Sequence, residues 1–138
     1  MRVTDENLVG SHPDAVPGQW VRACLLADLA VGRGVGVLGP EFEQAALFRV
    51  PTGESDREAV AGRTRLYAIG NIDPFARAAV LSRGLTGDRG GEPTVASPLG
   101  KQVFSLRTGI CLDDETVAVR SYAVAVVDDA VEVYFPDK

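Results

Sequence analysis

Apolar and polar positions alternate most clearly near the end of the chain. The segments 116–127 and 130–135 are rich in valine, tyrosine and phenylalanine, and Asp128 and Asp129 separate them. Two alternating runs of β-branched and aromatic residues around a short polar connection are typical of a β-hairpin. The last part of the chain is therefore predicted to be an antiparallel pair of strands.

Shorter runs upstream carry a similar pattern. In the segment 32–39, Val35 and Val37 alternate with glycines, which favours a strand that another backbone approaches closely. The segment 25–29 is predicted to be a short turn. We predict the remaining strands within 20–24, 44–50, 66–70, 92–98 and 101–106, the last two joined by a tight connection.

One segment follows helical rules instead. Asp73 stands in a capping position, Pro74 at the first helical position and Gly84 after the end. These signals predict a short helix or helical turn near 74–82. Short strands separated by turn signals dominate everything else, so the fold class is all-β, a sandwich or small barrel with at most this one short helix.

The length and punctuation of the chain indicate a single domain. The chain has 138 residues, enough for one independent core. Residues 1–18 contain glycine and proline without a sustained period and are predicted to form a flexible N-terminal arm. Residues 19–138 are predicted to form one β domain. The segment 51–64 within it carries charge, proline and glycine, and is predicted to be a long, mobile hairpin loop.

Charge and cysteine usage limit the partners and the location. The formal net charge is −5, which argues against a nucleic acid or an anionic membrane as a partner, since both need a basic face. No targeting segment or run of about 20 apolar residues is visible, so the expected location is the cytoplasm. A reducing compartment would keep Cys24 and Cys111 as thiols.

Candidate catalytic and metal-binding groups are few. The only histidine, His12, lies in the predicted arm, which is a poor place for a rigid catalytic imidazole. Cys24 and Cys111 are far apart in the chain and are expected to be small core residues. The carboxylates at 113–115 and 128–129 are expected to mark solvated turns. The glycine-rich segment 83–93 matches no nucleotide-binding pattern and is expected to be a loop with several positive φ angles. No catalytic centre is expected in this chain alone.

Two segments resemble the cluster-binding boxes of Rieske iron–sulfur domains. Residues 97–109 read SPLGKQVFSLRTG, which is similar to the second box, Cys-Pro-x-His-Gly-x-x-Phe-x-Leu-x-x-Gly. Residues 67–73 read YAIGNID, which resembles the approach to the first box, Cys-x-His. All four ligand positions are substituted, by Asn71, Asp73, Ser97 and Gly100. A Rieske cluster needs two cysteines and two histidines, so we expect neither a metal nor any other cofactor in this chain.

A Rieske-type fold without cluster ligands resembles the small subunit of bacterial assimilatory NAD(P)H-dependent nitrite reductase. The similarity extends over about residues 20–135 and is strongest in the segment 71–114. The resemblance implies a Rieske-like β sandwich and a partner, the large subunit, that carries FAD, an iron–sulfur cluster and sirohaem and reduces nitrite to ammonium. The small subunit would hold no redox centre and would support or regulate the large one.

In a Rieske domain the two boxes form an exposed tip, and loops on a rigid scaffold are common binding surfaces. We therefore expect the equivalent tip here to contact the large subunit. The candidate contact residues are Arg83, Asp88, Arg89, Leu99 and Lys101.

Three alternatives to this subunit remain open at the level of sequence. The chain could be a Rieske-fold binding or scaffold module for another oxidoreductase. It could be an electron-transfer ferredoxin, which would require a cluster. It could also be an independent enzyme using carboxylates, which predicts turnover by the isolated chain.

Overall fold

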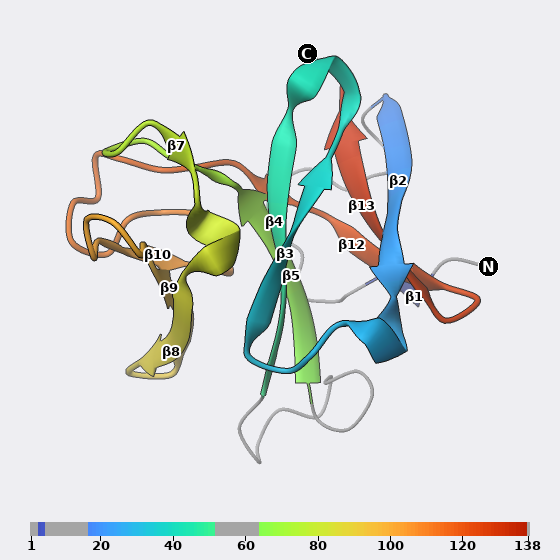
Figure 1. Ribbon diagram of the computed structural model, residues 1–138, viewed down its shortest axis with the longest axis horizontal. Helices are drawn as coiled ribbons and strands as arrows, with labels where there is room; N and C mark the ends of the chain where they lie inside the picture. Colours follow the sequence, from blue (N-terminus) through green and yellow to red (C-terminus); the bar gives the residue numbers. More distant parts are fainter. Residues whose placement is uncertain (1–2, 5–16, 52–63, 138) are drawn as a thin grey trace.

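The computed structural model describes residues 3–4, 17–51 and 64–137, and these residues form an antiparallel β fold with two main sheets (Figure 1). One sheet has the order β1-β12-β13-β2 and the other the order β11-β5-β4-β3. The strands of the first sheet are β1 (Val3–Thr4), β2 (Gly18–Leu25), β12 (Val124–Val127) and β13 (Ala130–Pro136). The strands of the second, central sheet are β3 (Arg33–Leu38), β4 (Gln44–Pro51), β5 (Thr64–Gly70) and β11 (Ser121–Tyr122).

Smaller elements lie on the other side of the central sheet, as Figure 1 shows at its left. We call residues 71–112 the side region. It contains β6 (Ile72–Asp73), β7 (Ala78–Ala79), β8 (Leu85–Arg89), β9 (Glu92–Ala96) and β10 (Val103–Ser105). β6 pairs with β7, and β8, β9 and β10 form a meander. Single turns of 3-10 helix occur at Leu26–Asp28, Pro40–Phe42 and Leu81–Arg83.

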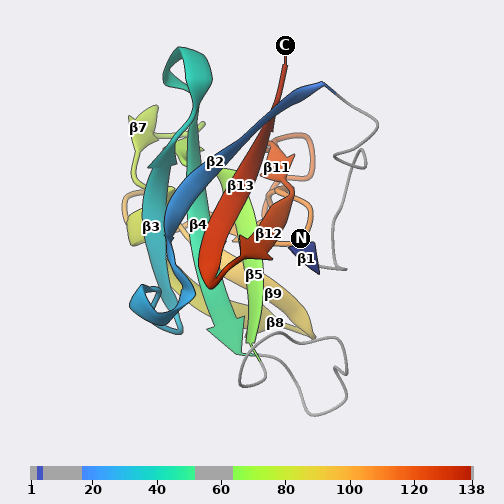
Figure 2. The same ribbon diagram turned by 90° about the vertical axis from the view of Figure 1, so that its right-hand side faces the viewer.

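The predicted closing hairpin is confirmed. β12 and β13 pair from Val124↔Val133 to Val127↔Ala130, and Asp128 and Asp129 form the connection with φ angles of 49° and 65°. Short polar side chains tolerate this left-handed region better than β-branched ones. β13 then pairs along β2, with an irregularity between Val131 and Glu132. The C-terminal strand is therefore central in its sheet (Figure 2).

One glycine of β3, Gly34, permits the close backbone approach that the alternation of glycine and valine predicts, whereas Gly36 has only ordinary contacts. A Cβ atom on Gly34 would lie 2.5 Å from the backbone oxygen of Ser82 and 2.5 Å from the ring of Phe48. No side chain fits at such distances, so glycine is required there. This contact brings the 3-10 turn at 81–83 against the central sheet and helps to place the side region.

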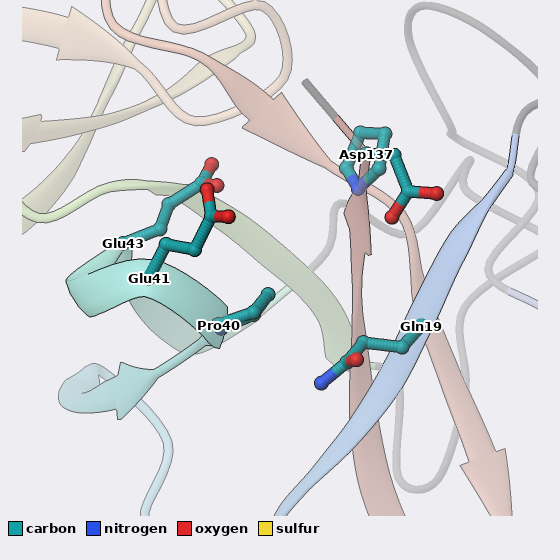
Figure 3. A pocket seen from close by; sticks show the side chains of 6 residues that line it. Gln19, Pro40, Glu41, Glu43 and Asp137 are labelled. Atoms are coloured by element: carbon teal, nitrogen blue, oxygen red, sulfur yellow. The ribbon is translucent and has the colours of Figure 1, made fainter.

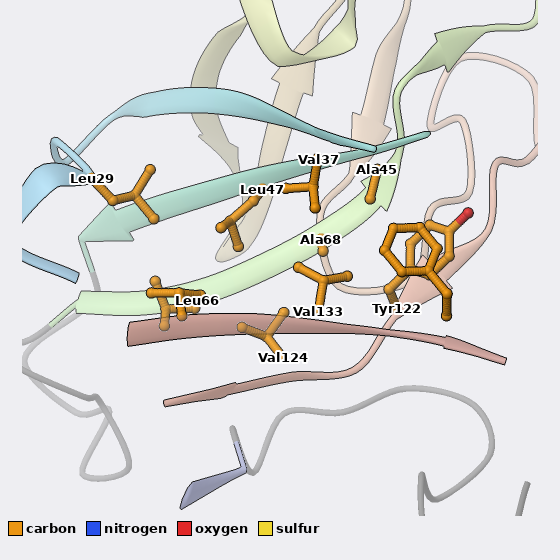
Figure 4. Packing of buried hydrophobic residues seen from close by; sticks show 11 residues of the cluster. Leu29, Val37, Ala45, Leu47, Leu66, Ala68, Tyr122, Val124 and Val133 are labelled. Atoms are coloured by element: carbon orange, nitrogen blue, oxygen red, sulfur yellow. The ribbon is translucent and has the colours of Figure 1, made fainter. Parts of the chain in front are cut away.

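The central sheet is buried on both faces, because alternate residues of β4 and β5 point to opposite sides. The first core lies between the two main sheets and includes Leu47, Leu66, Val133 and Phe135 (Figure 4). The second core lies between the central sheet and the side region and includes Phe48, Ile69, Leu81, Val95, Phe104, Leu106 and Cys111. Burial on both faces explains why 44–50 and 66–70 read as almost continuous apolar runs.

The helix expected near 74–82 is not continuous. Residues 74–77 form a turn, β7 follows, and a separate 3-10 turn occupies Leu81–Arg83. Arg77 has a φ angle of 55°, which ends the helical geometry after one turn. Ala78 and Ala79 then pair with Asp73 and Ile72. The short β6–β7 hairpin thus forms in place of a continuous helix.

Two other predictions need correction. The segment 83–93 was expected to be a loop, but residues 85–89 form β8, and only Gly90 and Gly91 in this segment have positive φ, at 60° and 91°. The run 116–127 is not one strand, because β11 and β12 are separate and residues 116–120 contribute only an isolated bridge, Ile110↔Ala118.

The predicted arm and mobile loop fall largely outside the described residues. Of residues 1–18, Val3–Thr4 form β1, which pairs with β12, and β2 begins at Gly18. Residues 52–63 of the predicted loop and His12 are not among those described. Within the described ranges, no helix is long and apolar enough to cross a membrane.

Candidate functional site

A hydrogen bond between two buried side chains joins the loops that correspond to the two Rieske boxes. Asp73 lies on β6, and Ser97 follows β9. The Ser97 hydroxyl donates to Oδ2 of Asp73, and the two residues are 1% and 0% exposed. We call this contact the interloop bond. It connects two of the four substituted ligand positions.

The Asp73 carboxylate has further donors on its own loop. Its Oδ1 accepts hydrogen bonds from the backbone N–H groups of Phe75 at 2.8 Å and Ala76 at 3.2 Å. The N–H of Arg77 donates to the Asp73 carbonyl oxygen at 2.7 Å. A buried carboxylate is stable only when donors satisfy its oxygens. The predicted capping role of Asp73 is therefore correct, although the element that it caps is a single turn.

Asn71 makes its contacts elsewhere. Its Nδ2 donates to Oε1 of Gln44 at 3.2 Å, and its Oδ1 accepts from the N–H of Ser82 at 2.8 Å. Backbone bonds from the N–H of Asn71 to Gln44 and from the N–H of Leu81 to Asn71 run beside these. The first substituted position thus fastens the end of β5 to β4 and to the 3-10 turn at 81–83.

Gly100 lies in a tight exposed loop. The N–H of Lys101 donates to the Ser97 carbonyl at 3.1 Å, the N–H of Ser97 donates to the Gln102 carbonyl at 2.9 Å, and Lys101 has a φ angle of 66°. A Cβ atom on Gly100 would lie 2.1 Å from Oε1 of Gln102. A side chain at this position, such as the histidine that a Rieske cluster needs, would therefore require the Gln102 side chain to move.

The side chains at the four positions do not fit an iron–sulfur cluster. They present an amide, a carboxylate, a hydroxyl and no side chain, whereas the cluster takes two thiolates and two imidazoles. The carboxylate and amide are already hydrogen-bonded within the protein. No group of three or more potential metal-ligating residues occurs in the described part of the chain. Cys24 packs against the first core and Cys111 belongs to the second, so the thiols do not meet.

The structure divides the predicted contact residues into two groups. Leu99 and Lys101 lie in the exposed loop after β9. Arg83 belongs to the same end of the β8–β9 hairpin, because it lies just before Leu85, which pairs with Ala96 at the end of β9. Asp88 and Arg89 lie at the opposite end of the β8–β9 hairpin, four residues or roughly 13 Å along the strand. There Asp88 accepts a bond from the Gly91 N–H at 2.7 Å, and Arg89 pairs with Asp113 at 3.2 Å. The five residues do not form one cluster.

The carboxylates at 113–115 and 128–129 occupy exposed turns. Asp113 accepts from the Val103 N–H at 2.9 Å, and this bond, followed by the one from Arg89, lowers the pKa of its carboxyl. Asp114 accepts from the hydroxyl and N–H of Thr116, which lowers its pKa as well. Asp114 thus receives its donors from its own turn, whereas Asp113 receives them from Val103 and Arg89.

A groove beside Asn71 was not predicted from the sequence. It has a volume of about 350 Å³, and Phe42, Glu43, Ile72, Arg120 and Tyr122 are among its lining residues. The Tyr122 hydroxyl donates to Oε2 of Glu43 at 2.5 Å, and Arg120 lies 3.4 Å from the same oxygen. Burial, and then the bond to Glu43, raise the pKa of Tyr122. Glu43 and Tyr122 are 79 positions apart, so no local pattern signals their contact.

A smaller pocket of about 200 Å³ adjoins the groove and shares Glu41 and Glu43 with it. Figure 3 shows these carboxylates on one side and that of Asp137 on the other, with Gln19 and Pro40 also lining the pocket. The described residues that line it include three acids and no lysine or arginine.

Comparison with known proteins agrees with this architecture. Residues 19–134 match the family model of the Rieske-like [2Fe-2S] domain, which defines the class of the fold. Within that class, the nitrite reductase (NADH) small subunit of Salmonella typhimurium is 43% identical over 115 residues, covering 83% of this chain and 96% of the relative. The chain belongs to the family of nitrite reductase small subunits.

Two further relatives support this placement. A crystal structure assigned to an NADH-dependent nitrite reductase small subunit from Mycobacterium tuberculosis has a TM-score of 0.76 and 41% identity, covering 88% of this chain and 98% of the other. The nitrite reductase [NAD(P)H] large subunit of Klebsiella oxytoca is 40% identical over 120 residues, which are 86% of this chain but 11% of that protein. In that protein, a domain of this kind is part of the large subunit.

Proposed function

We propose that this chain is the non-redox small subunit of an assimilatory nitrite reductase that uses NAD(P)H to reduce nitrite to ammonium. Its role is to support or regulate the large subunit that carries out the reaction. The observation that carries the proposal is the similarity to a nitrite reductase small subunit over 83% of this chain and 96% of that relative. The interloop bond agrees with it, because hydrogen bonds stabilise the two boxes where a Rieske protein would use its cluster.

The partner is the large subunit. The Klebsiella oxytoca relative carries a similar domain within a nitrite reductase large subunit, so the two parts work within one polypeptide there. We infer that a separate chain with the same domain binds its large subunit non-covalently, where the Klebsiella oxytoca protein has a covalent link. The alternative, a scaffold module for another oxidoreductase, is not favoured, because these relatives are named as parts of nitrite reductase.

The finer features of the complex are also proposals. The resemblance implies that the large subunit carries FAD, an iron–sulfur cluster and sirohaem, and that the small subunit adds no cofactor. A cytoplasmic location agrees with the two cysteines, Cys24 and Cys111, which are both free thiols.

We also propose that the exposed loop after β9 contacts the large subunit. Leu99 is 58% exposed in this loop, Lys101 follows it, and Arg83 precedes the neighbouring strand β8. Asp88 and Arg89 lie at the far end of the hairpin, so they serve as an internal comparison. Lys101→Glu is expected to weaken binding more than Arg89→Glu. Equal affinities for both variants and the unmodified chain would remove this loop from the interface.

A titration into the purified cognate large subunit tests the main proposal. Complex formation and nitrite-dependent NAD(P)H oxidation are followed together. We expect binding accompanied by a change in turnover rate or in enzyme lifetime. Absence of a complex at micromolar concentrations, an interaction weaker than about −8 kcal/mol, would overturn the partner assignment.

A further inference from the structure

Phe42 presents the most exposed large apolar side chain among the described residues. Its side chain is 86% exposed, at the connection between β3 and β4. Phe42 has a φ angle of 64°, and the preceding Glu41 has one of 55°. The left-handed region is unfavourable for residues of this kind. The fold therefore maintains an unfavourable backbone geometry at an aromatic side chain that adds almost no burial to the isolated chain.

Strained backbone of this kind occurs preferentially at functional sites, and the surroundings of Phe42 fit that interpretation. Phe42 lines the groove described above, together with Ile72, which is 48% exposed. The lining also contains Tyr122 and Arg120, which both hydrogen-bond to the Glu43 carboxylate. The groove thus has an apolar lip and a polar wall whose groups already contact one another. Aromatic residues at such positions are common anchors of protein interfaces.

The adjoining acidic pocket determines the chemistry of the occupant. Glu41 and Glu43 lie between the groove and the pocket, and Asp137 lies on the pocket's far side (Figure 3). A segment that fills both spaces needs an apolar side chain against Phe42 and Ile72. It also needs a cationic side chain, lysine or arginine, among the carboxylates. Complementary charge of this kind fixes the register of a bound segment and speeds encounter.

We propose that this composite surface, formed by the groove at Phe42 and the acidic pocket, binds a segment of the nitrite reductase large subunit that carries an apolar and a basic side chain. The proposal rests on the proposed function, because it takes the large subunit as the partner. The groove includes Asn71, two residues before Asp73, so the bound segment lies beside the interloop bond. The small subunit thereby contacts its partner next to the place where a Rieske domain carries its cluster.

Two substitutions with matched controls test the proposal in the full-length chain. Phe42→Ala removes the aromatic anchor, and Val31→Ala is its control, because Val31 is 49% exposed, precedes β3 and does not line the groove. Glu41→Lys reverses charge at the pocket, and Glu115→Lys reverses an exposed charge elsewhere. All four side chains are exposed, so the variants are expected to keep the thermal midpoint of the unmodified chain, which is measured first.

Affinity for the purified large subunit is then measured by calorimetry at two salt concentrations. Phe42→Ala and Glu41→Lys are each expected to weaken binding at least tenfold, while both controls stay within about twofold. Glu41→Lys is also expected to reduce the dependence of affinity on salt. If the unmodified chain binds and both groove variants bind equally well, the docking surface is wrong and the proposed function stands. If the unmodified chain does not bind at all, both proposals fail.

Discussion

The first and second cores lie on opposite faces of the same central sheet, but different interactions hold the elements that cover them. The first core is closed by β13 and its neighbours, whose long antiparallel pairing is accompanied by buried side chains such as Val133 and Phe135. The second core is closed by the side region, whose strands are short and whose loops are joined by hydrogen bonds donated to the side chains of Asp73 and Asn71. Apolar burial dominates on one face, whereas polar side chains complete the other.

This difference shows how a scaffold can lose a metal centre without losing its shape. In a Rieske domain, the cluster ligands connect the two boxes. Here the carboxylate of Asp73 and the hydroxyl of Ser97 connect the same two loops, and apolar side chains such as Phe104 and Leu106 fill the second core. Three of the substituted positions, Asn71, Asp73 and Ser97, thus hydrogen-bond within the fold, and the docking surface that we propose lies beside them.

Loss of a large side chain in the first core is expected to have the largest effect. Phe135 is fully buried, and its ring fills the space above Gly39, where a Cβ atom would lie 2.5 Å away. Phe135→Ala should reduce the free energy of unfolding by about 4 kcal/mol, as cavity-forming changes of this size do. Urea unfolding followed by circular dichroism measures it. A loss below about 1 kcal/mol would mean that the first core does not govern global stability.

Removal of the Asp73 carboxylate comes next. Asp73→Ala leaves the Ser97 hydroxyl and the N–H groups of Phe75 and Ala76 without their acceptor. We expect a loss of about 3 kcal/mol, since hydrogen bonds to a charged group are strong and buried unpaired donors are costly. Glu115→Ala, at an exposed turn, is the control and should stay within about 0.5 kcal/mol.

The same Asp73 variant can show which region opens. Cys111 lies in the second core and is fully buried, so its reaction with a thiol reagent reports opening of the side region. In a Cys24→Ser background, Asp73→Ala should accelerate the labelling of Cys111. The increase in rate should exceed the increase that the loss of global stability alone would produce. If the labelling rate increased only as much as global unfolding predicts, the side region would not open independently of the first core.

Ser97→Ala tests the other side of the interloop bond and should have a smaller effect. The change removes the donor to Asp73 and the acceptor for the Leu99 N–H, which lies 3.3 Å from Oγ, but leaves the backbone donors to Asp73 in place. We expect a loss of about 1.5 kcal/mol in urea unfolding. If Ser97→Ala costs as much as Asp73→Ala, the backbone donors contribute nothing and the hydroxyl alone secures the carboxylate.

The smallest expected effect concerns pH and the exposed carboxylate of Asp113. The pKa of Asp113 is lowered by the Val103 N–H and then by Arg89, so the folded chain binds this proton less tightly than the unfolded chain. The contribution to stability is therefore present above the unfolded-state pKa and is lost as pH falls through the folded-state pKa. Asp113→Asn should flatten the fall in stability below about pH 4. Urea unfolding over a pH series measures it; an unchanged slope would contradict the assignment, and Glu115→Gln is the control.

Much of the fold followed from local patterns in the sequence. The closing hairpin, β4 and β5 were predictable because their apolar periodicity agrees with their place in the sheets. Of the short helix or helical turn predicted near 74–82, a turn at 74–77 and a 3-10 turn at Leu81–Arg83 form, because the pairing of Ala78–Ala79 with β6 separates them. The strand β8 was missed because LTGDR has no apolar alternation and gains its pairing from β9.

The site was predictable only in part. Resemblance to the Rieske boxes identified Asn71, Asp73, Ser97 and Gly100, but not that Asp73 and Ser97 bond to one another, because their 24-residue separation carries no local signal. The groove at Phe42 was missed for the same reason. Its walls come from the β3–β4 connection, the end of β5 and the approach to β11, which meet only in the folded chain.

The interloop bond has a consequence for the order of events during synthesis. A loop joint made by a metal centre closes only after the metal has been delivered, so folding then depends on supply. The interloop bond between Asp73 and Ser97 consists only of side chains of the chain itself, which are present as soon as it is synthesised. This region can therefore reach its final shape during folding, at a pace set by the chain and independent of iron delivery.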